Sequence, residues 1–238
     1  MSVKEILIVG ATSDIGLQLI KDLHSENKGI KIWAHGNSST QKIEKIKEET
    51  KGSIEAIQCN LAIAEEVSSF ANKIKDQNID SVIFLAAPPF EYIRFKDLEM
   101  KRAREEFQIQ YFSTIEILKA VTSSMLQKKS GKIILMLSEV VLGDSPAALT
   151  HYTSAKYALL GLLNSLSSEY KSKNIQVNAL SPGMIDTQFI SKLPHKHAEI
   201  AAEASKIKRL LNPADITPRI LELLKEDKSG LNLETFGE

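Results

Sequence analysis

The sequence predicts an α/β fold, a doubly wound parallel sheet of about seven strands flanked by helices, in one domain. Two observations support this prediction. Short β-rich runs alternate with longer helical patterns along the whole chain, and most of these runs are continuously apolar. Continuous apolar character is typical of strands that helices cover on both faces. In such a sheet the ligand site is expected at the carboxyl ends of the strands.

The expected elements follow one another in regular alternation. The strands are expected at residues 6–9, 30–34, 54–58, 81–86, 132–137, 175–180 and 231–235. The helices are expected at residues 15–25, 40–50, 65–78, 98–128, 152–171 and 213–225. Asn212 followed by Pro213 supports the start of the last helix, because asparagine caps helices and proline is favoured in their first turn.

Composition excludes several classes of protein. The chain has 238 residues, of which 30 are basic and 30 acidic, so its formal net charge is zero. This balance argues against nucleic acid or an anionic membrane as the main partner. No apolar stretch reaches the ~18 residues of a membrane span, and the first apolar run is too short for a signal peptide. We therefore expect a soluble, cytoplasmic protein with neither a nucleic-acid nor a membrane partner.

Disulfide and metal chemistry are not expected. Cys59 is the single cysteine, and no Cys/His pattern has zinc spacing. His195 and His197 are two residues apart, so they would point apart on a helix, and no carboxylate or cysteine partner is evident. These histidines belong to residues 188–211, a segment that interrupts the strand–helix alternation. The segment could be a lid over a substrate pocket, or a surface excursion with one docking helix.

Residues 10–16, Gly-Ala-Thr-Ser-Asp-Ile-Gly, join the first expected strand to the first helix. A glycine at the strand exit permits a tight turn, and free N–H groups at the start of a helix suit a pyrophosphate. Gly16 would let the helix pack closely on the sheet. A plain strand-to-helix turn, capped by Ser13 or Asp14, is the alternative interpretation.

Tyr152 and Lys156 are four positions apart in a helical pattern, so they share a helix face. A lysine ammonium there would favour the phenolate and lower the tyrosine pKa from ~10, which would make Tyr152 an acid/base near neutral pH. A surface Tyr–Lys pair on a solvated helix is the alternative. Ser138 follows the fifth apolar run, and Ser181-Pro182-Gly183 forms a turn after the sixth. Both are expected at the crevice edge of the sheet.

In this order and spacing, these motifs resemble the short-chain dehydrogenase/reductase family, within it the single-domain group that includes 3-oxoacyl-carrier-protein reductases. The resemblance implies a Rossmann-type sheet and one dinucleotide-binding and catalytic domain over residues 1–238. It implies that Tyr152 donates a proton to a substrate carbonyl or accepts one from an alcohol. Lys156 would bind the nicotinamide ribose, and Ser138 would hydrogen-bond the substrate oxygen. Gln110 stands where the family has a catalytic asparagine that holds a water in the proton relay to the lysine.

The resemblance also implies a set of cofactor-binding residues. They are Gly10, Thr12, Ser13, Asp14 and Ile15 at the phosphate turn, Asn60 and Leu61 beside the adenine, Ala86 near the adenosine ribose, Ile185 and Thr187 at the carboxamide, and Tyr152 and Lys156. No carboxylate follows the second strand before Glu44, so we expect Asn37 and Ser38 to receive a 2′-phosphate. This favours NADP as the cofactor, with NAD as the alternative because no arginine is present there.

Three departures from the family pattern stand near the expected site. Asp14 replaces the middle glycine of the turn, and its carboxylate would repel a pyrophosphate unless it points away as a helix cap. Residues 84–87, Phe-Leu-Ala-Ala, replace Asn-Asn-Ala-Gly. Gln110 replaces the asparagine. We expect its amide to reach a water beside Lys156, and the alternative is an amide packed between helices.

The resulting functional prediction is an oxidoreductase that transfers hydride between NADP(H) and a small-molecule carbonyl or secondary alcohol. A dinucleotide-binding regulatory or scaffold protein with reduced or no turnover is the alternative. The family's usual interface, through helices 98–128 and 152–171, implies a homodimer or homotetramer. A group of cations could receive an anionic substrate or form a solvated helix face: Lys192, Lys196, Lys206, Lys208 and Arg209.

Overall fold

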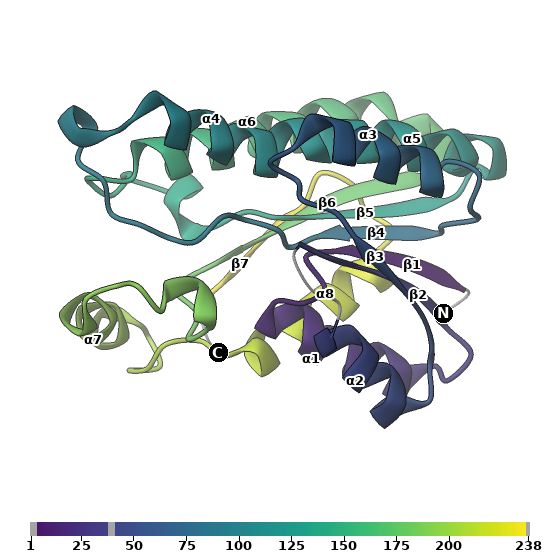
Figure 1. The fold of residues 1–238 in the computed structure, drawn as a ribbon, viewed down its shortest axis with the longest axis horizontal. Helices are drawn as coiled ribbons and strands as arrows, with labels where there is room; N and C mark the ends of the chain where they lie inside the picture. Colours follow the sequence, from purple (N-terminus) through teal and green to yellow (C-terminus); the bar gives the residue numbers. More distant parts are fainter. Residues whose placement is uncertain (1–3, 38–40, 237–238) are drawn as a thin grey trace.

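A computed structural model describes residues 4–37 and 41–236 of the chain. Within them, seven strands form one parallel sheet in the order β3-β2-β1-β4-β5-β6-β7 (Figure 1). The strands are β1 (Glu5–Val9), β2 (Lys31–Gly36), β3 (Ser53–Gln58), β4 (Ser81–Phe84), β5 (Gly131–Met136), β6 (Ile175–Pro182) and β7 (Asn232–Thr235). The predicted fold class and all of the predicted strands are confirmed, with boundaries that differ by at most two residues.

Helices cover both faces of the sheet (Figure 1). One face carries α1 (Asp14–Glu26), α2 (Gln41–Thr50) and α8 (Pro213–Lys225). The other carries α3 (Ala64–Ile74), α4 (Met100–Phe107), α5 (Ser113–Lys128) and α6 (Thr150–Glu169). A further helix, α7 (His195–Ala204), lies near the carboxyl ends of the strands. No helix in the described part of the chain is long and apolar enough to cross a membrane.

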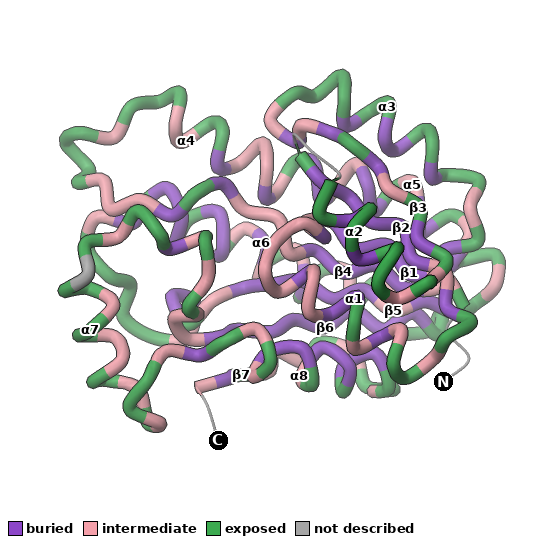
Figure 2. Tube along the Cα trace, turned by 60° about the horizontal axis from the view of Figure 1, so that its bottom comes forward, coloured by how far each residue is buried: buried purple, intermediate pink, exposed green. Residues whose placement is uncertain are grey.

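The two helical layers bury separate cores against the sheet. Alternate residues of β1 belong to different cores: Leu7 and Val9 pack with α3, α5 and α6, whereas Ile6 and Ile8 pack with α1, α2 and α8. The central strands are accordingly buried along their length (Figure 2). This two-sided burial is the physical reason why their sequences lack polar alternation.

The expected single helix over residues 98–128 is wrong in one respect. Between α4 and α5 the backbone widens into one π-helical turn, η2 (Gln108–Phe112). The hydroxyls of Ser113 and Thr114 each donate to a carbonyl four residues earlier, at 2.6 Å. Such turns recur at functional sites, and this one contains Gln110.

The order of the strands reverses between β1 and β4, because the chain leaves β1 toward α1 on one face and leaves β4 toward α4 on the other. The loops after these two neighbouring strands therefore diverge, and they open a crevice at the carboxyl edge of the sheet. The fold thus predicts where a ligand binds before any side chain is considered.

Candidate active site

A cavity of about 880 Å³ occupies this crevice. Most of the residues predicted for the site line it: Gly10, Thr12, Ser13, Asp14, Ile15, Asn37, Asn60, Leu61, Ala86, Ser138, Tyr152, Lys156, Ile185 and Thr187. Ser38 falls outside the described residues, so its predicted role stays a prediction. Gln110 is the exception, because its side chain is buried away from the cavity.

Gly10 gives the turn after β1 its shape. It has a φ of +90°, and a Cβ atom there would lie 2.8 Å from the backbone nitrogen of Ala86. Only glycine therefore fits, and the close approach of the two loops leaves a cradle at the start of α1. Ser13 caps this helix by accepting the N–H of Gly16 at 3.1 Å. The cradle and the helix N-terminus beside it fit a dinucleotide pyrophosphate.

The Asp14 carboxylate is hydrogen-bonded outside this cradle. Its Oδ2 accepts the backbone N–H of Gln188 at 2.7 Å, so the carboxylate is committed to the segment that follows β6. The Gln188 side chain in turn accepts a hydrogen bond from Lys42 Nζ at 3.3 Å. Ser13 provides the predicted cap, and Asp14 instead ties down the segment that follows β6.

His35, at the end of β2, is a residue that the sequence reasoning missed. Its Nδ1 accepts the N–H of Gly10 at 3.0 Å, and its Nε2 lies 2.9 Å from the carbonyl oxygen of Cys59. The ring therefore joins the glycine turn to the loop after β3, as the tautomer protonated on Nε2. Burial lowers the pKa of His35, which favours this neutral form. A histidine inside an otherwise apolar strand was the available signal.

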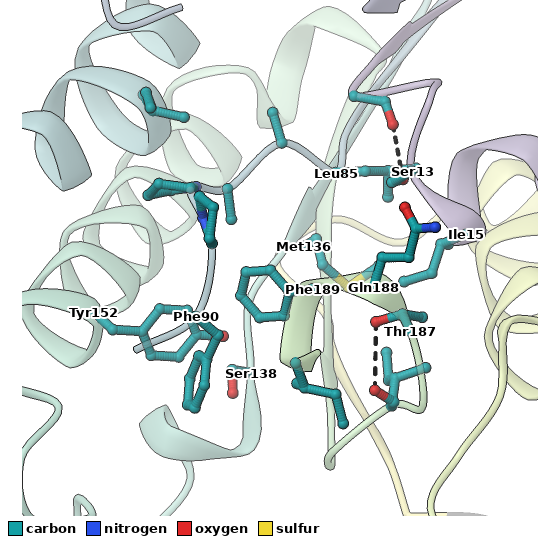
Figure 3. Close-up of a pocket in the computed structure, with 18 of the residues that line it drawn as sticks. Ser13, Ile15, Leu85, Phe90, Met136, Ser138, Tyr152, Thr187, Gln188 and Phe189 are labelled. Carbon is teal, nitrogen blue, oxygen red and sulfur yellow. Dashed lines mark hydrogen bonds between the residues drawn. The ribbon is translucent and has the colours of Figure 1, made fainter. Parts of the chain in front are cut away.

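Tyr152 and Lys156 begin α6, and Ser138 follows β5, so the helix and the strand bring the three together. Tyr152 and Ser138 lie side by side at one end of the cavity (Figure 3). Lys156 Nζ donates to the Met136 carbonyl at 2.7 Å and lies 5.5 Å from the centre of the Tyr152 ring. The surface-pair alternative is excluded, since Tyr152 and Lys156 are 7% and 3% exposed.

The expected lowering of the Tyr152 pKa is not what the structure gives. Burial raises the pKa of this phenol, a hydrogen bond with Ser138 opposes the rise, and Glu106 and Glu139 add to it. Burial also lowers the pKa of Lys156 to about 8, against the opposing effect of Glu106. Desolvation therefore favours the uncharged form of both groups, and it outweighs the lysine–phenolate attraction that the sequence suggested.

Aromatic rings wall the cavity around Tyr152. The Phe90 ring meets the Tyr152 ring edge-on with centroids 5.1 Å apart, and the Phe189 ring lies 6.3 Å away. The N–H of Phe90 donates to the Phe189 carbonyl at 3.2 Å, so both sides of the cavity are joined. Neither ring belongs to a motif, and the sequence reasoning did not single them out.

Gln110 matches neither of its two predictions fully, the amide beside Lys156 or the amide simply packed between helices. Its side-chain nitrogen donates to the carboxylate of Glu106, one helical turn earlier. Its backbone carbonyl accepts the Thr114 hydroxyl at 2.6 Å. The amide is thus enclosed in the helical layer, as the packing alternative states, but its partner there is an ionisable side chain.

Comparison with known proteins places the chain in a class. Residues 4–198 match the short chain dehydrogenase family. Dehydrogenase/reductase SDR family member 4 of Rattus norvegicus is 27% identical over 236 residues, which cover 98% of this chain and 84% of that protein. The 3-oxoacyl-[acyl-carrier-protein] reductase FabG of Rickettsia prowazekii (strain Madrid E) is 28% identical over 235 residues, 98% of this chain and 94% of that protein.

Solved structures agree on the fold. The structure of ElxO with NADP bound superposes with a TM-score of 0.85 at 21% identity, covering 98% of this chain and 97% of that chain. That of YwfH, an NADPH dependent reductase involved in bacilysin biosynthesis, has a TM-score of 0.86 at 20% identity, covering 99% and 98%. The chain belongs to the short-chain dehydrogenase/reductase family. It is an NAD(P)-dependent oxidoreductase acting on CH–OH or C=O groups.

The buried neutral His35 predicts a pH dependence of stability. Its pKa in the folded state lies below the ~6.5 of an unfolded histidine, so the unfolded chain takes up a proton first as the pH falls. The free energy of unfolding should therefore decrease below pH ~6.5, by up to ~1.4 kcal/mol per pH unit for this one group. In His35→Gln, urea denaturation over this range should show a smaller decrease than in the wild type. An equal decrease in both proteins would refute this assignment.

Proposed function

We propose that the protein is an NADP(H)-dependent reductase of neutral, apolar carbonyl compounds in which Tyr152 donates the proton. One observation carries the proposal: Tyr152, Ser138 and Lys156 meet at one end of a single cavity whose other end has the glycine cradle. The scaffold alternative gains no support from this arrangement, because a protein that only binds has no need of a buried Tyr–Lys pair.

Ser138, Tyr152 and Lys156 would each have a separate role toward the substrate carbonyl. The Ser138 hydroxyl and the Tyr152 phenol would both hydrogen-bond the carbonyl oxygen and polarise it. Because burial raises its pKa, the phenol keeps its proton at neutral pH and can give it to the oxygen as negative charge develops there. Lys156, when protonated, would stabilise the phenolate that remains. A bound nicotinamide dinucleotide supplies the hydride.

The remaining predicted residues would hold the dinucleotide. They are Gly10, Thr12, Ser13 and Ile15 at the pyrophosphate, Asn60, Leu61 and Ala86 around the adenosine, and Ile185 and Thr187 at the nicotinamide end. Asp14 would act through its bond to Gln188. Lys42, at the start of α2, also lines the cavity and would give a 2′-phosphate the cation that the sequence reasoning missed. The NADP-bound and NADPH-dependent structural neighbours support this choice.

An apolar substrate fits the walls around Tyr152 better than an anionic one. Phe90, Phe189 and Leu149 line the cavity there, and Glu139, which also lines it, would disfavour an anion when it is ionised. The cations that could have received an anion are largely engaged elsewhere. Lys192 Nζ pairs with Glu91 at 2.9 Å, and Arg209 pairs with Asp215 at 2.6 Å.

Within one domain over residues 1–238, we propose that residues 188–211 act as the lid. Two contacts near the start of this segment support a closing role. The Gln188 N–H is held by Asp14 on the cofactor side, and the Phe189 carbonyl is held by the Phe90 N–H on the substrate side. The start of the segment is thus held from both sides of the cavity, and its opening would admit both ligands.

Replacing Tyr152 by phenylalanine tests the proton donor. Tyr152→Phe should lower kcat with a neutral apolar ketone and NADPH by ~10²–10⁴-fold, because it removes a general acid. Affinity for NADPH should change little, since the ring and its packing are retained. Steady-state kinetics and a fluorescence titration of NADPH measure the two effects. Tyr170→Phe, at the far end of α6, is the matched control. Wild-type turnover in Tyr152→Phe would exclude Tyr152 as the acid.

Replacing Lys42 tests the choice of cofactor. Lys42→Ala should weaken NADPH binding by about tenfold, the loss of one charge-assisted hydrogen bond, and should leave NADH binding nearly unchanged. Lys45→Ala, an exposed lysine of the same helix, is the control. Tighter binding of NADH than NADPH by the wild type, or an equal loss for both cofactors, would contradict this role.

We propose that the protein forms a homodimer through the helices α4, α5 and α6. Two such dimers could associate into a homotetramer. Phe112 in η2 and Tyr157 in α6 are apolar side chains that remain 52% and 44% exposed on neighbouring helices. Phe112→Lys combined with Tyr157→Lys should convert the assembly toward monomer in light scattering after size exclusion. Phe95→Lys, at a more exposed phenylalanine before α4, should not. A monomeric wild type would end this proposal.

A further inference from the structure

A buried ionic cluster lies in the helical layer that carries Tyr152 and Lys156, and the reaction proposed above does not use it. Glu106 on α4 is 1% exposed. Its carboxylate accepts the side-chain N–H of Gln110 and pairs with Arg102 at 2.8 Å. Arg102 also lies 3.7 Å from Glu91, which pairs with Lys192 of the lid segment at 2.9 Å.

The cluster faces the start of α6. His151 Nε2 is 3.9 Å from Glu106 Oε2, so the carboxylate points at the residue that immediately precedes Tyr152. The helices α5 and α6 lead into the parallel strands β5 and β6, and they therefore run in the same direction. One turn further along, Gln110 in η2 and Lys156 in α6 follow in the same order. Glu106, Gln110 and Lys156 thus belong to one helix–helix contact.

A carboxylate buried this far from water is costly unless cations and donors surround it. Burial raises the pKa of Glu106, and this effect outweighs the lowering by Arg102, Gln110 and Lys156. The ionisable groups that face this contact come from four elements: Arg102 and Glu105 on α4, Glu91 in the loop after β4, Glu139 in η3, and His151, Tyr152 and Lys156 on α6. Among them, Lys156 is the group that must already be charged when Tyr152 gives up its proton.

Burial alone would make Lys156 a poor cation. It lowers the pKa of Lys156 to about 8 even though Glu106 acts in the opposite direction. The backbone carbonyl of Met136, at 2.7 Å, is the hydrogen-bond acceptor of Nζ and carries no formal charge. The full negative charge that favours the ammonium therefore comes from the Glu106 carboxylate.

We propose that Glu106 is a positioning residue of the reaction, which keeps Lys156 protonated while Tyr152 gives up its proton, and that Arg102 keeps Glu106 ionised for this task. The inference rests on the proposed function, in which Lys156 stabilises the Tyr152 phenolate. Gln110 then orients the Glu106 carboxylate through its amide N–H, which would account for a glutamine where the family has an asparagine.

Removing the charge of Glu106 tests the inference. In Glu106→Gln, which keeps the shape, Lys156 should lose its proton at lower pH. The alkaline limb of kcat for carbonyl reduction should therefore move down by about one pH unit, the size of a nearby opposite charge. Glu106→Asp should restore much of the wild-type profile. Glu99→Gln removes a charge from an exposed residue at the start of α4 and should leave the profile unchanged.

Arg102 supplies an independent second test. Arg102→Met removes the cation that holds Glu106 ionised, so the alkaline limb should shift in the same direction as in Glu106→Gln. In the double variant the shift should be no larger than in Glu106→Gln alone, because the arginine acts through the carboxylate. Additive shifts would show that Arg102 acts by another route and would overturn this part of the proposal.

A measurement that needs no turnover separates this proposal from the proposed function. NMR of protein labelled with carbon-13 at the lysine ε carbon, with the Lys156 signal assigned from Lys156→Arg, gives its titration directly. A lower Lys156 titration midpoint in Glu106→Gln than in the wild type supports the positioning role even if no carbonyl compound is reduced. Equal midpoints in the two proteins overturn it even if the enzyme is a reductase. Arg102→Met decides the matter by the same measurement should Glu106→Gln fail to fold.

Discussion

The site depends on a constraint of the backbone, the reversal of strand order between β1 and β4. Because all the strands are parallel, the loops after β1, β4, β5 and β6 leave the sheet at one edge. The reversal sends two of them to opposite faces, and the cavity fills the space between them. The backbones nevertheless approach closely where Gly10 meets Ala86, and a single methyl group there would collide with the neighbouring loop. The glycine cradle and the end of the cavity that holds Tyr152 are therefore parts of one backbone arrangement.

The fold was predictable because burial on both sides leaves a plain trace in sequence. Strands such as β1 and β5 are apolar at nearly every position, and their predicted limits agree with the observed ones to within one residue. The π-helical turn at Gln110 was not predictable. The Ser113 and Thr114 hydroxyls bond backbone carbonyls within it, but Thr122 makes the same kind of bond inside α5, where the helix stays regular. Periodicity reports which face is buried and carries no information about such bonds.

The residues of the site likewise fall into those that the sequence could predict and those that it could not. Residues within one motif, such as Tyr152 and Lys156, could be found because their spacing fixes their geometry. Phe90, Gln188 and Glu106 could not be found in this way, because each contacts a partner that is remote in sequence or is buried in a way that spacing does not reveal. His35 left a signal in its apolar strand, but its partners Gly10 and Cys59 are remote in sequence. The predicted lowering of the Tyr152 pKa was wrong because the spacing does not reveal burial. A lysine four residues away suggests a lowered pKa, and only the closed pocket shows that desolvation is the larger effect.

Charge balance explains why a buried carboxylate would suit the proposed reaction, in which Tyr152 becomes a phenolate. Glu106 disfavours the Tyr152 anion directly, and it favours the Lys156 cation. With Lys156 protonated, the group formed by Arg102, Glu106, Lys156 and neutral Tyr152 carries one net positive charge, and proton donation by Tyr152 makes it neutral. With Lys156 neutral, the same donation would turn a neutral group into a buried anion. The low dielectric of the interior penalises the second change far more than the first. Under the proposed mechanism, the carboxylate therefore assists the step through the lysine, although it opposes the phenolate directly.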